Sequence, residues 1–304
     1  MITNKNASQW RYATSVVSVL LMVVAILTLS VKGLNFGQDF TGGVVSEVRV
    51  AEHINSQTIV SGLSAVQEAG VSAGVSVVSA GEQGRWMIRF PVPDAGMDLA
   101  PLQAALTQLD PQVEILNTSM VGPQVGKEMV EQGGLAMLIC LISIMAYLSF
   151  RFEWRQASGA LLAMVHDVLL VLGLFSLLQL EVNLTVFAAL LAVIGYSLND
   201  SIVIADRVRE LLQAKAKTNT PLADINNQAI VSTLTRTLIT SGTTLMTISA
   251  LWLLGGSALE GFAITMFFGI LVGTWSSISM GTCLPELLKL KAEHYLPEPL
   301  PAGP

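Results

Sequence analysis

Six polar residues stand in stretches of sequence that otherwise carry almost no charge. They are His166, Asp167, Asn199, Asp200, Arg236 and Thr240. Ionisable groups inside a membrane span are costly, so they suggest a functional site by default. A carboxylate beside a fixed cation can gain and lose a proton, whereas an arginine keeps its charge. The residue types therefore predict a proton pathway, with Asp200 as the exchanging group and Arg236 as its counter-charge.

The elements that must position these residues are membrane-spanning helices. A helix needs about 20 consecutive apolar residues to cross a bilayer. Six such runs are expected, at about 12–32, 131–150, 157–180, 184–206, 234–255 and 262–284. At ~1.5 Å per residue, Asp167 and Asp200 fall at comparable depth in the inner half of the membrane. Arg236 is expected nearer the cytoplasmic face, and its long side chain can reach towards Asp200.

Hydroxyl side chains recur along the fifth run at helical spacing. Ser232, Thr240, Thr244 and Thr247 share a stripe with Arg236. Such a stripe can line a chain of water molecules or pack against a neighbouring helix. The charges of Arg236 and Asp200 favour the water-lined path. For His166, a proton relay and an ordinary hydrogen bond within the bundle are both open.

The sixth run carries small residues four positions apart, Gly269, Gly273, Ser277 and Gly281. This spacing lets helices approach closely. Packing inside the chain is favoured over a face between subunits.

Every cluster of basic residues that flanks the spans falls on the same side, which sets the orientation. The short turns after the third and fifth runs carry Glu181 and Glu260 and no cation. Both termini are therefore expected in the cytoplasm, and the segment between the first two spans outside. The first run is too long for a signal peptide and lacks an A-x-A-like cleavage site, so an uncleaved anchor is expected. The predicted organisation is 1–34 cytoplasmic N-terminus and first span, 35–128 outer domain, 129–284 spans two to six, and 285–304 cytoplasmic tail.

The outer segment shows the periodicities of a small α+β domain. Alternating apolar residues predict strands, and apolar residues three or four apart predict helices. The expected elements are a strand at 44–50, a helix from Asn55 to Gly70, strands at 75–79 and 85–92, a helix at 99–109 and a strand at 113–116. The order βαββαβ favours a ferredoxin-like fold. The fold class is thus an α-helical membrane protein, a six-span bundle with one such periplasmic domain.

Composition excludes several classes of function. Of 304 residues, 52% are hydrophobic and 12% charged, and the net charge of −6 speaks against nucleic-acid binding. Cys140 and Cys283 lie in apolar runs and build neither a disulfide framework nor a metal cluster. The chain has no H-E-x-x-H helix, G-x-S-x-G elbow or Walker-type loop. No enzyme activity, cofactor or metal is expected.

Several motifs resemble the SecF family of bacterial protein-translocase subunits. The run Asp39, Phe40, Thr41, Gly42, Gly43 after the first span is similar to the family's D-F-T-G-G signature. Gly122, Pro123 and Gly126 before the second span are similar to its G-P-x-V-G motif. His166-Asp167, the run from Asn199 and the segment around Arg236 also match in kind and order. The resemblance covers about 10–290.

The resemblance implies membership of the SecD/SecF family within the proton-driven resistance–nodulation–division superfamily. It implies a SecD partner that completes a twelve-span core, and action with the SecYEG channel on exported polypeptides at the bacterial inner membrane. The family's functional carboxylate and arginine carry over to Asp200 and Arg236. The two glycine-rich motifs imply either a hinge or a static tight connection where the outer domain joins the bundle. Two alternatives are a small-molecule exporter of the same superfamily and a passive scaffold of the translocon.

Overall fold

Apolar helices make up most of the computed structural model, which describes residues 4–67, 75–79, 84–90, 100–218 and 220–295. Within these residues, six helices are long and apolar enough to cross a membrane. They are Ser8–Lys32, Gln124–Arg151, Trp154–Leu178, Leu184–Ala214, Leu222–Leu254 and Ala258–Leu287. The six predicted spans are confirmed, and most of the helices extend well beyond the apolar run that predicted them.

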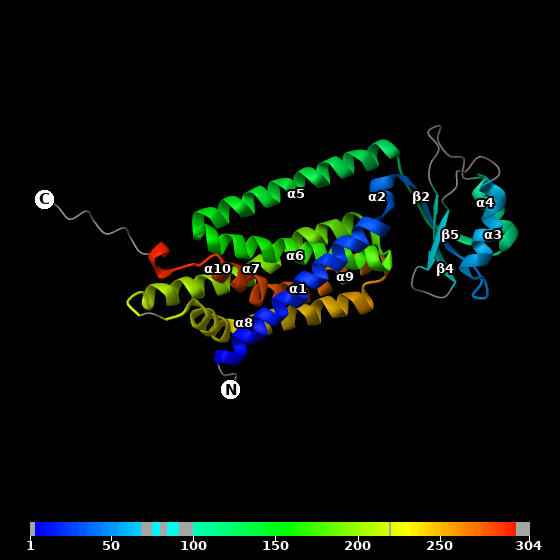
Figure 1. Ribbon diagram of the computed structural model, residues 1–304. Helices are drawn as coiled ribbons and strands as arrows, with labels where there is room; N and C mark the ends of the chain where they lie inside the picture. Colours follow the sequence, from blue (N-terminus) through cyan, green and yellow to red (C-terminus); the bar gives the residue numbers. More distant parts are fainter. Residues whose placement is uncertain (1–3, 68–74, 80–83, 91–99, 219, 296–304) are drawn as a thin grey trace.

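The spanning helices form a bundle with the sheet domain at one end (Figure 1). They are α1 (Asn4–Lys32), α5 (Pro123–Arg151), α6 (Trp154–Leu178), α7 (Leu184–Ala214), α8 (Leu222–Leu254) and α9 (Ser257–Ile278), the last continued by α10 (Met280–Leu287). A 3-10 turn, η1 (Ala292–Tyr295), follows. The N-terminus of α1 and η1 lie at the end of the bundle opposite the sheet domain.

Side-chain caps set where two of these helices begin. The carboxylate of Glu153 accepts the backbone N–H of Arg155 at 2.8 Å at the start of α6. The amide oxygen of Asn183 accepts the backbone N–H of Val186 at 3.0 Å at the start of α7. Caps of this kind satisfy the free N–H groups of a first turn. They fix where α6 begins and where α7 begins after the short turn at Glu181.

Helix α7 is the centre of the bundle. It packs against α9, α6 and α8, while α1 packs mainly against α6. Helices α1, α5 and α8 bury little of their apolar surface within the chain. In Figure 1, α5 lies at the edge of the bundle. Three of the six spans are therefore left with large uncovered apolar faces.

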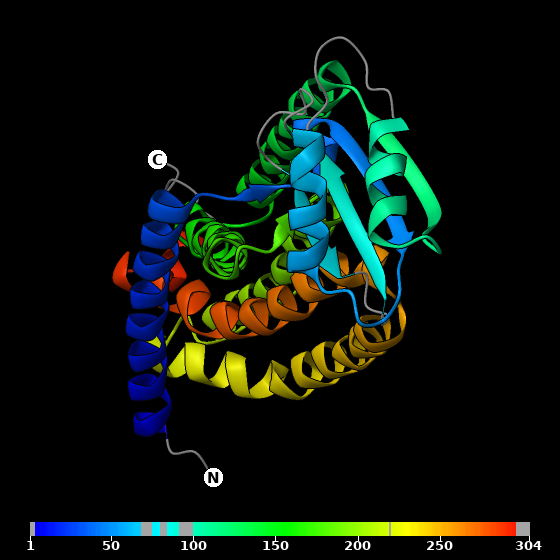
Figure 2. The same cartoon turned by 90° about the vertical axis from the view of Figure 1, so that its right-hand side faces the viewer.

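The outer domain is a four-stranded sheet covered by two helices on one face. Its elements are β2 (Gly43–Arg49), α3 (Ser56–Gln67), β3 (Ser76–Ser79), β4 (Arg85–Phe90), α4 (Ala100–Leu109) and β5 (Glu114–Val121). All pairs are antiparallel in the order β3-β4-β2-β5. Figures 1 and 2 show α3 and α4 on the face turned away from the bundle. Val48, Ile59, Ile88 and Leu106 meet in the core between the sheet and these helices.

The element order βαββαβ is the one expected from the sequence, and the ferredoxin-like assignment stays a prediction. The last strand, predicted at 113–116, continues to Val121 because β5 pairs with the whole length of β2. The expected helix end at Gly70, the helix start at Leu99 and residues 91–92 of the third strand lie outside the described residues.

A small second sheet joins the domain to the bundle. Strand β1 (Asn35–Phe36) pairs in parallel with β6 (Glu181–Val182) in the α6–α7 turn. A single helical turn, α2 (Gln38–Thr41), follows β1 and leads into β2. The sequence predicted only a short turn at Glu181, and the pairing shows that this turn is a docking point for the outer segment.

Candidate functional site

Asp200 lies on α7 at the centre of the bundle. Its side chain is buried, with 3% exposed. Ser241 of α8 interacts electrostatically with the carboxyl group, and its hydroxyl hydrogen bonds to that of Thr274 on α9 at 2.8 Å. The carboxyl oxygen Oδ2 is buried and has no hydrogen-bond partner among the described residues. Leaving such an oxygen unpaired costs free energy. The position suits a group that exchanges a proton.

Arg236 lies on the exposed side of α8 and interacts electrostatically with Asp200. Within the described residues, no ion pair of 4.0 Å or less joins the two side chains. Asn199, beside Asp200 on α7, is exposed. In this conformation the carboxylate and the guanidinium are therefore close enough to attract each other without being in contact.

The hydroxyl groups along α8 donate hydrogen bonds to backbone carbonyls of the same helix. Thr240 Oγ1 donates to the carbonyl of Arg236 at 2.9 Å, and Thr244 Oγ1 donates to the carbonyl of Thr240 at 2.8 Å. Thr247 and Ser232 bond in the same way. Ser232 also accepts a hydrogen bond from Arg207 at 3.2 Å, and Thr244 accepts one from Tyr196 at 3.4 Å. The four α8 side chains are exposed or half-buried, so a water-lined path along them stays a prediction.

A second buried polar cluster surrounds Asp167 on α6. The Nδ1 atom of His166 lies 2.8 Å from Asp167 Oδ1. The other oxygen, Oδ2, accepts hydrogen bonds from Ser197 on α7 and, at 2.9 Å, from Ser276 on α9. His166 Nε2 is buried without a partner in the described part of the chain. The cluster ties three helices together through one carboxylate.

Sequence reasoning missed Ser197 and Ser276. Ser197 precedes Asp200 by three residues, which places it about one turn away on α7. The three-residue spacing from Asp200 was the feature of the sequence that could have identified Ser197. Ser276 follows Gly273 by three residues, and a Cβ atom built on Gly273 would lie 3.4 Å from Asp167 Oδ2. The small residues of α9 therefore leave the space that the polar cluster around Asp167 occupies.

The predicted internal packing of these small residues is confirmed at Gly269 and Gly273. A Cβ atom built on Gly269 would overlap the side chain of Val193 on α7. A Cβ atom on Gly273 would lie 3.2 Å from that of Ser197. The absence of side chains at these positions sets how closely α9 approaches α7.

The first glycine-rich motif forms a compact joint. Asp39 Oδ2 accepts the backbone N–H of Leu184 at 2.8 Å, in the first turn of α7. Phe40 packs edge-on against Phe187 of α7, with ring centroids 6.4 Å apart. Thr41 ends α2 and is followed by Gly42 and Gly43, whose φ angles of 71° and 134° favour glycine. The motif thus fixes the outer segment to the beginning of α7.

The second motif meets the first. Pro123 stands in the first turn of α5, after the N-cap Gly122. A Cβ atom built on Gly126 would lie 2.9 Å from the carbonyl oxygen of Phe40 and 3.0 Å from the backbone nitrogen of Gly42. The two motifs, about 80 residues apart, therefore pack backbone against backbone.

Comparisons with known proteins agree with this arrangement. Residues 101–291 match the family model described as "Protein export membrane protein SecD/SecF, C-terminal". The chain is 43% identical over 293 residues to the protein translocase subunit SecF of Vibrio alginolyticus, covering 95% of this chain and 91% of the relative. It is 40% identical over 293 residues to that of Escherichia coli O157:H7, covering 95% and 89%. The chain belongs to the SecD/SecF family.

Solved structures of the family also match. The crystal structure of SecDF from Thermus thermophilus, described as a translocon-associated membrane protein, superposes with a TM-score of 0.81 at 34% identity. The match covers 93% of this chain and 38% of the SecDF chain. A second structure, SecDF in a super-membrane-facing form, gives a TM-score of 0.67 at 35% identity. This SecF-like chain thus corresponds to one part of a longer SecDF chain.

At the end of the bundle opposite the sheet domain, charged side chains form pairs that the sequence did not reveal. Arg11 of α1 is 3% exposed and bonds to Glu286 of α10 at 2.9 Å. It also donates to Asn227 of α8 at 3.0 Å and to Thr282 at 3.2 Å. The only signal in the sequence was an arginine at the start of an apolar run. The network holds three helices together away from the Asp200 site.

Asp206 pairs with Arg151 at the end of α5, with 2.6 Å between the charged atoms. This pair is about one-third exposed. It joins the loosely packed α5 to α7. Among the described residues, no group of three His, Cys, Asp or Glu side chains could hold a metal ion.

Proposed function

We propose that this chain is an accessory subunit of the protein translocase that works with SecD and uses the proton-motive force to assist late steps of export through SecYEG. Its relatives are named protein translocase subunit SecF, and the solved SecDF is described as translocon-associated. The observation that carries the proton-coupled part is Asp200, a buried carboxylate with one unpaired oxygen near the charge of Arg236.

The uncovered faces of α5 and α8 support a membrane partner. Leu238, Ile239 and Met246 of α8 are 57%, 60% and 73% exposed, and Arg236 is exposed on the same helix. A second six-span subunit placed there would cover these apolar groups and enclose Arg236. SecD is the proposed partner, because the solved SecDF chain contains this fold as 38% of its length.

Proton uptake would act through the attraction between Asp200 and Arg236. A neutral Asp200 loses that attraction, and α7 and α8 can shift relative to one another. Moving one charge across 100 mV supplies about 2.3 kcal/mol. That free energy biases a two-state arrangement about 50-fold, since ~1.4 kcal/mol is a factor of ten.

The joint at Asp39 offers a route from α7 to the outer domain. Asp39 binds the first turn of α7, and β2 begins four residues later. A shift of α7 would therefore move the sheet, which meets the exported polypeptide in this proposal. In this proposal the two glycine-rich motifs act as the hinge about which the outer domain moves. The chain would lie in the inner membrane with both termini in the cytoplasm.

The test measures proton flux and export in vesicles that contain the chain together with SecD. Asp200→Asn keeps the size of the side chain but cannot exchange a proton, so flux should fall to that of empty vesicles and export should slow. Asp206→Asn, on the same helix but paired with Arg151 at the bundle end, is the matched control and should retain flux.

Three results would refute the proposal. Normal flux and export in Asp200→Asn would remove the proton-coupled role. Normal export with both Asp200 and Arg236 neutralised, in an assembled complex, would indicate a passive scaffold. Loss of small-molecule efflux without an export defect in a deletion strain would indicate an exporter.

A further inference from the structure

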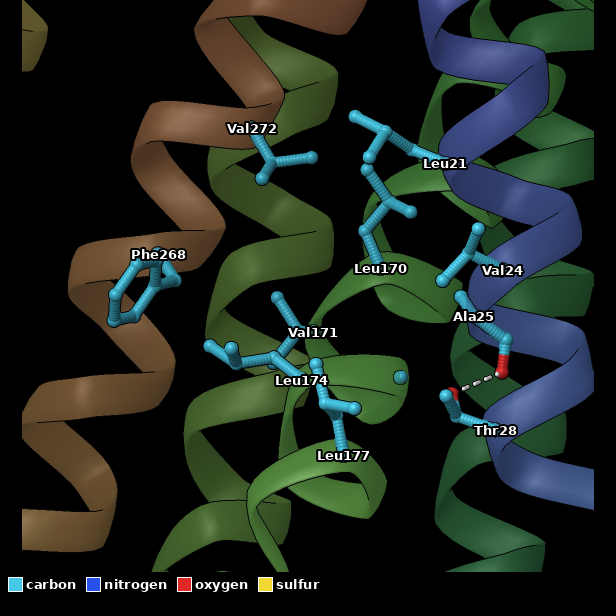
Figure 3. A pocket seen from close by; sticks show the side chains of 11 residues that line it. Leu21, Val24, Ala25, Thr28, Leu170, Val171, Leu174, Leu177, Phe268 and Val272 are labelled. Atoms are coloured by element: carbon cyan, nitrogen blue, oxygen red, sulfur yellow. Dashed lines mark hydrogen bonds between the residues drawn. The ribbon is translucent and has the colours of Figure 1, made fainter. Parts of the chain in front are cut away.

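A cavity of about 220 Å³ lies between α1, α6 and α9. Figure 3 shows its walls, which include Val24 of α1, Leu174 of α6 and Phe268 of α9. Thr28 is the one polar side chain of this lining, and its hydroxyl donates to the carbonyl of Ala25 at 2.9 Å. Every lining residue belongs to a membrane-spanning stretch. The cavity is therefore apolar and surrounded by hydrocarbon rather than water.

The cavity opens on the surface that faces lipid. Leu21, Val24 and Leu177 are on its rim and are 46%, 50% and 45% exposed. At its base α1 and α6 touch, because a Cβ atom on Gly173 would lie 2.8 Å from the Cα of Ala25. A helix with side chains is about 10 Å across. A slot between two helices in contact is too narrow for a third helix, and it admits a flexible chain.

A cation stands at one end of this slot. Lys32 is the last residue of α1 and is exposed. Its Nζ donates to the carbonyl of Leu177, a rim residue, at 3.0 Å. From Leu21 to Lys32 the helix rises about 16 Å at 1.5 Å per residue. Half of a hydrocarbon core is about 15 Å. The cavity and the lysine together therefore match the depth of one leaflet.

We propose that this slot binds an anionic phospholipid of the outer leaflet, with one acyl chain in the cavity and the phosphate at Lys32. An acyl chain restores the dispersion contacts that the apolar walls lack when no atoms lie opposite them. A lysine at the membrane boundary attracts the negative headgroup. The site is separate from Asp200 and does not depend on proton coupling.

Native mass spectrometry of the complete chain tests the acyl-chain part. The chain is extracted from vesicles that contain equal amounts of phosphatidylglycerol and phosphatidylcholine. The wild type should retain one phosphatidylglycerol. Val24→Trp fills the slot and should lose it. Val23→Trp, on the same helix and 49% exposed but outside the lining, should keep it.

The headgroup part is tested by Lys32→Gln. Its preference for phosphatidylglycerol over phosphatidylcholine should fall about fivefold, the equivalent of ~1 kcal/mol for one basic side chain at a membrane surface. Lys127→Gln, an exposed lysine at the start of α5, should leave the preference unchanged.

Several outcomes would overturn the proposal. The cavity is not the site if Val24→Trp retains the lipid, or if Val23→Trp loses it equally. The headgroup assignment is wrong if Lys32→Gln binds with unchanged preference. Loss of a co-purifying membrane protein instead of lipid in Val24→Trp would show that a partner covers this face.

Discussion

The ion pair between Arg89 of β4 and Glu181 of β6 joins the sheet domain to the bundle, and its removal should loosen that junction. The two side chains are in direct contact and are 19% and 22% exposed. Burial lowers the pKa of the Arg89 guanidinium below its ordinary value, and the charge of Asp39 opposes that shift. Glu181→Gln would therefore leave a partly desolvated cation without its nearest counter-charge.

The magnitude follows from this partial burial. Exposed ion pairs contribute about 0–1 kcal/mol, and breaking a fully buried pair costs about 3–5 kcal/mol. A pair that is four-fifths buried lies between these limits, at ~2 kcal/mol. At ~1.4 kcal/mol per factor of ten, the open state of the junction should become about 30-fold more populated.

Hydrogen exchange at the amide of Gly37 reports this opening directly. That N–H donates to the carbonyl of Val182 at 2.8 Å, within the joint that Glu181 holds. When the junction recloses faster than the amide exchanges, the exchange rate is proportional to the population of the open state. Glu181→Gln should therefore accelerate exchange about 30-fold. The double variant with Arg89→Gln should be no worse than Glu181→Gln alone.

The matched control is Glu47→Gln. Glu47 pairs with Arg85 inside the sheet at 2.6 Å, and the two are 23% and 27% exposed. Breaking this pair should leave Gly37 exchange unchanged. Equal acceleration in Glu47→Gln, or less than about threefold acceleration in Glu181→Gln, would refute an ~2 kcal/mol contribution from the junction pair.

Three further changes test other parts of the structure. Gly126→Ala should lower the free energy of unfolding by about 1–3 kcal/mol relative to Gly134→Ala on the same helix, because only Gly126 meets backbone atoms; equal thermal stability of the two would contradict the close approach. Glu286→Gln should destabilise the chain by about 3 kcal/mol, since it leaves Arg11 buried without a counter-charge, and an unshifted melting temperature would exclude this. Backbone hydrogen bonds from Gln112 and Ala51 lower the pKa of Asp110. The contribution of Asp110 to the free energy of unfolding is therefore present above the ordinary pKa of about 3.9 and disappears as pH falls through the lower folded value. Asp110→Asn should flatten this acid dependence of stability in circular dichroism, and an unaltered profile would refute it.

The six spans and the strands could be predicted because their signals are local. A run of about 20 apolar residues specifies a span without reference to the rest of the chain. The alternation of Trp86, Ile88 and Phe90 with Arg85, Met87 and Arg89 likewise predicts β4. The comparable depths of Asp167 and Asp200 in the membrane stay a prediction, made by counting residues along the helices.

The partners of the charges could not be predicted. Arg11 and Glu286 are 275 positions apart, and Arg151 and Asp206 are 55 apart. Which carboxylate an arginine meets depends on how each helix is rotated and tilted in the bundle, and periodicity within one helix does not contain that information. The same holds for Ser276, whose hydroxyl reaches Asp167 only because Gly273 lets α9 approach.

The parallel pair of β1 and β6 also bears on how the chain is made. Asn35 pairs with Glu181, which is synthesised 146 positions later. At about 5–20 residues per second, the ribosome needs roughly 7–30 seconds to supply that partner. The sheet can complete its own core in the meantime, since β2 to β5 all precede the second span. Docking of the finished sheet onto the bundle through this pair must therefore follow the synthesis of spans two and three.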